Sequence, residues 1–320
     1  MASHPAVFLD LASVDRGDLD LAALHQAAAS WATYAQTPAE LTAARIGDAA
    51  VAVTNKVVID RAVMAGCPGL RLICVAATGT NNVDLEAARE RGTAVCNVTG
   101  YATPSVVQHV FALMLALTTR LAEHAAAAQD GRWAASGLFC LLDFPFRELA
   151  GKTLGIVGYG ELGRGVARVA EAFGMSVLVA QRPGAPPQEG RLPLDELLAR
   201  SDVVTLHVPL ADNTRGLIGE RELALMRPDA LLIDTARGGI VDEAALVAAL
   251  RAGRLGGAGV DVLAVEPPRG GSPLLEAPPP NLIVTPHVAW ASRESRQRLL
   301  DGVARNIEAF CAGRERNRVV

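Results

Sequence analysis

Short apolar runs alternate with stretches of helical periodicity through the second half of the chain. Six runs have the length and composition of buried strands, and apolar residues with the period of a helix separate most of them. This alternation predicts an α/β fold with a doubly wound parallel sheet. The runs are residues 153–157, 176–180, 203–207, 230–234, 257–262 and 282–285, and the helical patterns are residues 163–173, 193–199, 220–226 and 243–252.

The first hundred residues show the same alternation with shorter elements, which predicts a second α/β unit. Its apolar runs are residues 7–9, 50–53, 72–75 and 94–95.

Two long apolar-periodic segments lie outside these alternating regions. Residues 103–129 predict one long interdomain helix, with Pro104 in the first turn, where a helix tolerates proline. Residues 292–311 have amphipathic helical spacing and are expected to fold back onto the first unit. We therefore expect a discontinuous domain of residues 1–100 and 290–320, and a dinucleotide-binding domain of residues 101–289.

Length and composition narrow the class of protein. The chain has 320 residues, of which 50% are hydrophobic and 20% charged, and a net charge of −4. These values exclude a disordered or collagen-like chain and favour about two globular domains. Because no block of Lys and Arg occurs, we expect no nucleic-acid partner. The longest strongly apolar stretch, residues 110–117, is too short for a bilayer, so we expect no membrane association.

The cysteines give a first indication of the compartment. Five widely spaced cysteines without a Cys-x-x-Cys pair predict neither a disulfide framework nor a zinc site. The N-terminus lacks the basic and apolar regions of a secretion signal. We expect a cytoplasmic protein.

Residues 158–163 form a Gly-x-Gly-x-x-Gly loop between an apolar run and a helical pattern. Gly158, Gly160 and Gly163 permit a tight turn and a close backbone approach, while Glu161 and Leu162 begin a helix whose N–H groups can face a pyrophosphate. We expect these five residues to bind a dinucleotide. The alternative is a tight turn whose glycines serve packing alone.

The residues that end the next strand bear on the choice of cofactor. An acidic residue at this place binds the ribose hydroxyls and repels a 2′-phosphate, but here the strand ends in Gln181 and Arg182. A neutral amide followed by a guanidinium favours NADP over NAD. In the alternative, Gln181 is a neutral ribose ligand and Arg182 a solvated loop residue.

Several long strings are similar to those of one enzyme family. They are LHVPL at residues 206–210, TARGGIVD at 235–242, GVDV at 259–262 and TPHVAW at 285–290. With the glycine loop, they make most of the chain resemble the D-isomer-specific 2-hydroxyacid dehydrogenases. Residues 131–133 and 139–142 resemble most the glycerate dehydrogenase and hydroxypyruvate reductase branch. The resemblance implies a Rossmann cofactor domain and a flavodoxin-like substrate domain.

The resemblance also implies a catalytic trio of Arg237, Glu266 and His287. A guanidinium can pair with the carboxylate of a 2-oxo acid. An imidazole can give a proton to the developing alkoxide. A carboxylate beside the ring stabilises the imidazolium and fixes its orientation. Alternatively, Arg237 caps a loop, Glu266 is solvated and His287 is a core histidine.

Other contacts are implied in the same way. Thr78 and Gly79 would bind the substrate carboxylate together with Arg237, unless they form a plain β-turn. For Thr103 the alternative or additional role is a helix N-cap, and for Asp261 it is a strand-end carboxylate that caps a turn. The residues expected to contact the cofactor outside the glycine loop are Thr103, Gln181, Arg182, His207, Pro209, Thr214, Thr235, Ala236, Arg237, Asp261 and His287.

The implied function is an NAD(P)-dependent oxidoreductase that interconverts a small 2-oxo acid, hydroxypyruvate or glyoxylate, and its D-2-hydroxy acid. We expect no metal, and we expect a homodimer. The alternatives are a formate, phosphonate or phosphoglycerate dehydrogenase of the same family, or a nicotinamide-sensing binding protein. Gln108 and His109 are interpreted as packing or interface residues without chemistry.

Overall fold

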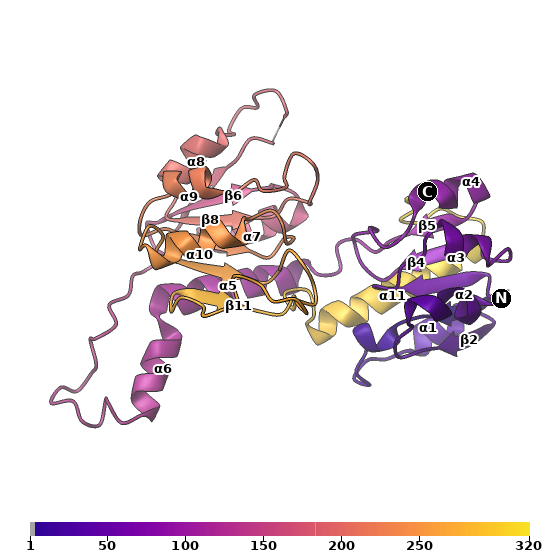
Figure 1. Cartoon of the computed structure of the whole chain (residues 1–320), viewed down its shortest axis with the longest axis horizontal. Coiled ribbons are helices and arrows are strands. Elements are labelled where there is room, and N and C mark those ends of the chain that lie inside the picture. The colour runs from indigo at the N-terminus through magenta and orange to yellow at the C-terminus, as the bar shows by residue number, and fades with distance from the viewer. Residues whose placement is uncertain (1–3, 183) are drawn as a thin grey trace. The chain divides into compact units, whose positions relative to one another are not determined.

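The computed structural model describes residues 4–182 and 184–320. The chain divides into two compact units (Figure 1). The first contains the residues up to Ala102 together with Trp290–Val320, and the second is Thr103–Ala289.

The first unit is built on a five-stranded parallel sheet with the order β2-β1-β3-β4-β5. This is the flavodoxin-like order. The strands are β1 (Pro5–Phe8), β2 (Ser30–Thr33), β3 (Val51–Thr54), β4 (Leu72–Val75) and β5 (Ala94–Cys96), and the α-helices before the crossing to the second unit are α1 (Ala22–Gln26), α2 (Thr42–Ile46), α3 (Arg61–Ala65) and α4 (Leu85–Arg91).

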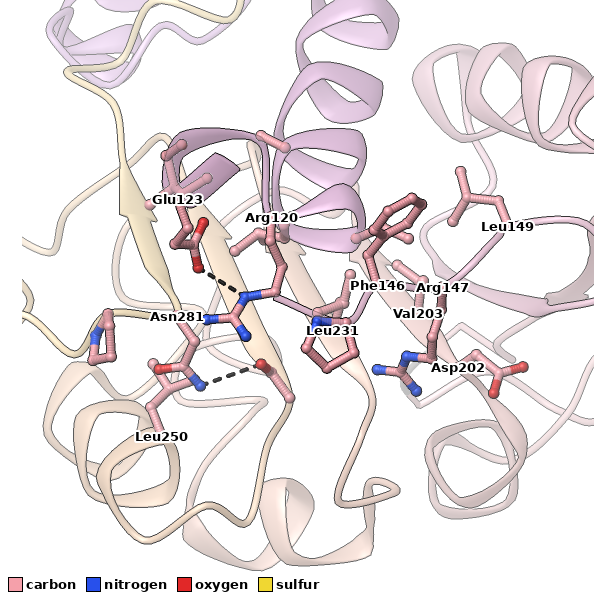
Figure 2. A pocket seen from close by; sticks show the side chains of 18 of the residues that line it. Arg120, Glu123, Phe146, Arg147, Leu149, Asp202, Val203, Leu231, Leu250 and Asn281 are labelled. Carbon is pink, nitrogen blue, oxygen red and sulfur yellow. Dashed lines mark hydrogen bonds and ion pairs between the residues drawn. The ribbon is translucent and has the colours of Figure 1, made fainter. Parts of the chain in front are cut away.

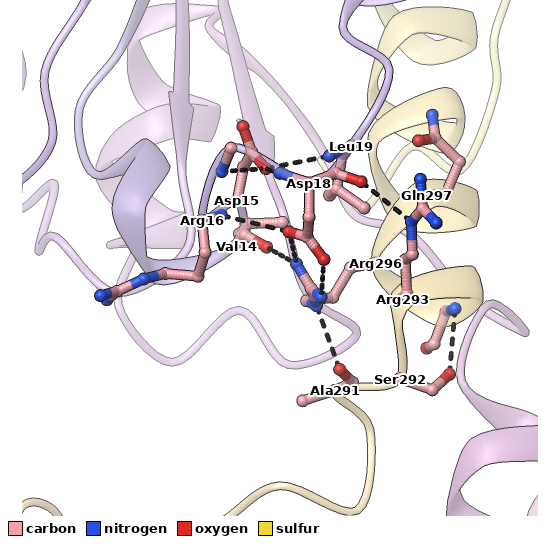
Figure 3. Close-up of polar contacts among 12 residues, drawn as sticks. Val14, Asp15, Arg16, Asp18, Leu19, Ala291, Ser292, Arg293, Arg296 and Gln297 are labelled. Atoms are coloured by element: carbon pink, nitrogen blue, oxygen red, sulfur yellow. Dashed lines mark hydrogen bonds and ion pairs between the residues drawn. The ribbon is translucent and has the colours of Figure 1, made fainter.

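Helix α11 (Arg293–Cys311) returns to this unit and packs against α1 and β4. Its apolar stripe, which includes Leu299, Val303 and Ile307, is fully buried. Arg296 on the same helix makes two hydrogen bonds to the Asp18 carboxylate, at 2.8 and 2.7 Å (Figure 3). This guanidinium holds the pKa of Asp18 well below its usual value. The C-terminal helix is thus fixed to the N-terminal part of the unit by both apolar and ionic contacts.

The second unit is built on a six-stranded parallel sheet with the order β11-β10-β9-β8-β6-β7. Both predicted parallel sheets, and with them the α/β fold class, are confirmed. The strands are β6 (Thr153–Val157), β7 (Ser176–Val179), β8 (Val203–Leu206), β9 (Leu231–Asp234), β10 (Gly257–Val260) and β11 (Leu282–Val284), and the helices are α5 (Thr103–Thr119), α6 (Leu121–Gln129), α7 (Glu161–Ala172), α8 (Leu194–Arg200), α9 (Glu220–Leu225) and α10 (Glu243–Arg251).

The segment predicted as one helix over residues 103–129 is two helices, α5 and α6, bent by 60°. Arg120 between them has a left-handed backbone, with φ +50°. This conformation ends the hydrogen-bond ladder of α5, and the Arg120 guanidinium then bonds Glu123 at 2.9 Å in the first turn of α6. Helix α5 packs against α7, β9 and β10 within the second unit.

Within the described ranges, no single helix is long and apolar enough to cross a membrane. The bent pair of α5 and α6 passes that test together, by length and composition only.

Candidate active site

The carboxyl ends of the six parallel strands of the second unit lie at one edge of its sheet. The chain order reverses between neighbouring strands β6 and β8, since β7 lies on the outer side of β6. Ligands of open α/β sheets bind in the crevice at such a switch point. The glycine loop follows β6 and residues 207–210 follow β8, so the structure brings these two predicted segments together.

The glycines of the loop fit the requirements of a bound dinucleotide. Gly158 has a φ of +98°, and a Cβ there would lie 2.5 Å from the His207 carbonyl oxygen. At Gly163 a Cβ would overlap with the carbonyl of Gly158, so α7 can approach the strand only because this residue has no side chain. A Cβ at Gly160 would meet nothing within 4 Å, and no side chain caps α7 there. The open space above uncapped N–H groups suits a pyrophosphate.

Two predicted cofactor contacts carry buried polar atoms without a hydrogen-bond partner among the described residues. These atoms are Nδ1 of His207 and Oγ1 of Thr235. Burial lowers the pKa of His207 to about 4, so the ring is neutral near pH 7. Its Nε2 lies 3.0 Å from the Thr205 hydroxyl. Because buried polar atoms are normally paired, these two atoms fit contacts to a ligand.

The end of β7 carries the predicted Gln181 and Arg182 and a cation that the sequence analysis missed. The Gln181 amide donates to the Ala185 carbonyl at 2.6 Å, and Arg182 is exposed. The guanidinium of Arg191 lies over the ring of Tyr159, in the glycine loop, with 5.0 Å to the ring centroid. A parallel β-bridge between Ala180 and Leu192 brings the chain back beside the end of β7 and places Arg191 there. The spacing of residues in the sequence could not have indicated the position of Arg191.

Further predicted cofactor contacts lie in loops after β8 and β9 and at the start of α5. Thr214 is buried, and its hydroxyl donates to the Pro209 carbonyl at 2.6 Å, which closes the loop after β8. Ala236 donates its N–H to Asp234 at 2.9 Å. The Thr103 hydroxyl donates to the Glu161 carboxylate at 2.6 Å, so α5 is bonded to the first turn of α7.

Glu266 and His287 form a close pair. Their Oε2 and Nδ1 atoms are 2.5 Å apart, and the other Glu266 oxygen accepts the Leu263 N–H at 2.8 Å. The side chains are 26% exposed for His287 and 32% for Glu266, so both are accessible from solvent. Since Nδ1 faces the carboxylate, Nε2 is the atom that can exchange a proton with a ligand.

Arg237 lies on the loop after β9, next to this pair. Its guanidinium donates to the Ala236 carbonyl at 2.7 Å, and the side chain is exposed. A Cβ on Gly238 would overlap with the carbonyl of Leu263. The loop of Arg237 therefore rests directly on the loop that carries Glu266, and the structure brings the three predicted catalytic residues to neighbouring loops.

Asp261 follows β10 and has a side chain with no solvent exposure. Its carboxylate accepts hydrogen bonds from the Thr285 hydroxyl at 2.5 Å and from the N–H groups of Val288 and Ala289 at 2.9 and 2.8 Å. These contacts correspond to the turn-capping alternative. A contact with the nicotinamide stays a prediction.

The predicted substrate contacts Thr78 and Gly79 belong to the first unit, in the loop after β4. The Thr78 hydroxyl donates to the Val98 carbonyl at 3.0 Å, and the Asn97 side chain donates to the Thr78 carbonyl at 2.7 Å. These bonds hold the turn in place. Their role in substrate binding stays a prediction.

A cavity of about 650 Å³ lies at the opposite edge of the second sheet, beside the amino ends of its strands (Figure 2). Arg120, Glu123, Phe146 and Arg147 lie on its wall. None of the predicted site residues lines it. The cavity is therefore separate from the candidate active site.

Comparisons with known proteins define the family. The family model described as "D-isomer specific 2-hydroxyacid dehydrogenase, NAD binding domain" matches residues 111–289. The chain is 46% identical to a glycerate dehydrogenase of Methylorubrum extorquens, over 97% of each chain. It is 38% identical to a hydroxypyruvate reductase of Blautia hydrogenotrophica, over 96% of this chain and 97% of the relative.

Solved structures agree with this assignment. An NADPH-dependent glyoxylate/hydroxypyruvate reductase from Sinorhizobium meliloti, solved with NADP and malonate, has a TM-score of 0.80 at 29% identity. It covers 97% of this chain, which in turn covers 94% of the solved chain. The chain belongs to the D-isomer-specific 2-hydroxyacid dehydrogenases, as its motifs predict. It is an enzyme that uses a nicotinamide dinucleotide and acts on a small 2-oxo or 2-hydroxy acid.

The buried carboxyl of Asp234, beside this site, gives a prediction for stability. Burial raises its pKa from 3.8 to about 7. Between these values the folded chain holds a proton that the unfolded chain has released, so stability falls as pH rises through this window. An amide side chain at this position does not titrate, so D234N should reduce the loss of unfolding free energy between pH 5 and pH 8 by at most about 3 kcal/mol.

The measurement is thermal unfolding at pH 5 and pH 8. The melting temperature of the wild type should fall further between pH 5 and pH 8 than that of D234N. Exposed Asp212 supplies the control, D212N, which should behave as the wild type. An equal fall of the melting temperature in wild type and D234N would contradict the raised pKa of Asp234.

Proposed function

We propose that this enzyme reduces hydroxypyruvate to its D-2-hydroxy acid, or glyoxylate to its achiral 2-hydroxy acid. The observation that carries the proposal is the Glu266–His287 pair at 2.5 Å, next to the loop of Arg237. It combines a proton donor, its carboxylate partner and a cation for the substrate carboxylate. The names of the relatives, glycerate dehydrogenase and hydroxypyruvate reductase, support this choice of substrate.

The reaction follows from these groups. When bound, the reduced nicotinamide supplies the hydride that goes to the keto carbon. Arg237 holds the substrate carboxylate through paired hydrogen bonds. His287 donates the Nε2 proton to the developing alkoxide, and Glu266 stabilises the imidazolium through Nδ1. In the oxidative direction His287 takes the proton back.

We further propose a preference for NADP over NAD. Neutral Gln181 would not repel a 2′-phosphate, and exposed Arg182 offers a charged partner for it. Arg191, which lies over Tyr159 of the glycine loop, adds a second cation at the end of the same strand.

We also propose a homodimer formed through the arm, which we define as residues 121–148. The arm begins with α6 and extends away from the sheet of its unit (Figure 1). It carries six of the thirteen large hydrophobic side chains most exposed in the described part of the chain, and Phe139 is 91% exposed. A second copy would cover this apolar surface. We place the enzyme in the cytoplasm, where its free cysteines stay reduced.

One prediction of this proposal tests the acid–base pair. H287A should lower kcat for hydroxypyruvate or glyoxylate by about 10² to 10⁴, because the proton donor is lost. Its Kd for NADPH should stay within about twofold of the wild type. Initial rates of NADPH oxidation and fluorescence titrations measure both. H25A, at an exposed histidine of α1, is the control, and near-normal turnover by H287A would refute the role.

Another prediction concerns the cofactor. R182A and R191A should each weaken NADPH binding by about 1 to 3 kcal/mol, because each removes a charged hydrogen bond to the 2′-phosphate. NADH binding should change little. The control is R200A, at an arginine of α8 that pairs with Glu196. Equal losses for NADPH and NADH would contradict the proposal.

A further prediction concerns the arm. Light scattering should give the mass of a dimer for the wild type and of a monomer for F139D/L142D, because two charges would enter the apolar contact. V58D, at an exposed apolar residue of the first unit, should remain a dimer. A monomeric wild type, or a dimeric double variant, would refute the interface.

A further inference from the structure

The acid–base residue lies in a turn whose backbone must be held in place. We call residues 285–289 the His287 turn. His287 has a φ of +54°, a left-handed conformation that L-residues adopt only where the surroundings impose it. Its N–H donates to the Asp261 carbonyl at 2.8 Å and to the Thr285 carbonyl at 3.0 Å. The next two N–H groups, of Val288 and Ala289, donate to the Asp261 carboxylate.

The Asp261 carboxylate is therefore the centre of this turn. Its two oxygens accept from the Thr285 hydroxyl and from two backbone N–H groups. Its side chain has no solvent exposure. A buried polar group depends on its hydrogen bonds, and the orientation of each donor matters.

Helix α5 supplies the group that orients the Thr285 hydroxyl. Nε2 of His109 lies 2.9 Å from Thr285 Oγ1 and 3.5 Å from Asp261 Oδ1. Thr285 has one hydroxyl hydrogen, which it donates to Asp261, so it can only accept from His109. His109 must then carry a proton on Nε2. One turn earlier on the helix, the Ser105 hydroxyl donates to the Ala289 carbonyl at 2.7 Å.

We propose that His109 is a positioning residue for the acid–base chemistry of His287. Its Nε2–H fixes the Thr285 hydroxyl on Asp261, and Asp261 fixes the His287 turn. The imidazole of His287 thereby keeps its distance to Glu266 and its direction toward the substrate. The inference rests on the proposed role of His287 as the proton donor.

The experiment compares H109A with H109Q, whose amide can still donate to Thr285. H109A should lower kcat by about tenfold while the KM for the 2-oxo acid and the Kd for NADPH change little, because the defect lies in proton transfer. H109Q should recover most of kcat. Q108A, at the neighbouring exposed residue of the same helix, should match the wild type.

A double-variant cycle tests whether the effect passes through Thr285. T285V keeps the shape of the side chain and removes the hydroxyl, and T285S keeps the hydroxyl. The loss in H109A/T285V should be no larger than in T285V alone, since both changes break one chain of hydrogen bonds. T285S should retain activity. If H109A does not fold, the inference is tested by the kcat of T285V compared with that of T285S, and by the kcat of H109Q.

Histidine side-chain NMR gives a readout independent of turnover. Long-range ¹H–¹⁵N spectra of the wild type should assign His109 to the tautomer with its proton on Nε2.

The outcomes separate this inference from the proposed function. If H287A is inactive but H109A has a normal kcat, the inference alone is overturned. The same holds if the losses of kcat in H109A and T285V multiply in the double variant, or if His109 carries its proton on Nδ1. An active H287A overturns the proposed function itself, and the role of His109 with it.

Discussion

Two buried carboxyl groups at the ends of neighbouring strands constrain the site of the second unit. Asp234 ends β9, and Asp261 follows the residue of β10 that pairs with it. Two ionised carboxylates this close in a buried site would repel each other. The two groups have different surroundings: Asp261 accepts three hydrogen bonds, whereas Asp234 accepts the N–H of Ala236, and burial raises the pKa of Asp234 to about 7. Asp261 thus organises a turn through its hydrogen bonds, while Asp234 stays neutral over much of the acidic range.

Around this centre, the loops approach one another where glycine removes a side chain. Gly158 lies against the His207 carbonyl, and Gly238 lies against the carbonyl of Leu263. The first contact joins the loops after β6 and β8, and the second joins the loops of Arg237 and Glu266. Because a Cβ would overlap with backbone at both places, no rotamer change could accommodate it. Backbone packing therefore sets the spacing of the functional side chains.

The sequence predicts the regular elements well because their signal is local. All six strands of the second unit lie within the predicted apolar runs, and α11 begins one residue after the predicted start. Strand β2 was missed because it is a short edge strand with mostly exposed residues, so it lacks an apolar run. The bend at Arg120 was missed because helical periodicity continues on both sides of a single left-handed residue.

The site itself could be predicted only in part. Arg237, Glu266 and His287 are far apart in sequence, and spacing alone does not connect them; the family resemblance named them, and their roles stay predictions. Arg191 and His109 were not assigned chemistry because their contacts depend on tertiary structure. Arg191 is placed by a bridge beside β7, and His109 by the packing of α5 on β9 and β10. A lone arginine or histidine carries no signal of such contacts.

Helix α5 connects several of these features through its spacing. Thr103 bonds Glu161 at the start of α7, while Ser105 and His109, one turn apart and hence on one face, bond the two ends of the His287 turn. The chain enters the second unit at Thr103 and leaves it after Ala289, so the bond between Ser105 and the Ala289 carbonyl joins the two crossing points. A shift of α5 would change the first turn of the glycine-loop helix and the backbone of His287 together. The same helix that fills the core with its apolar face thus couples the cofactor loop to the proton donor through its polar face.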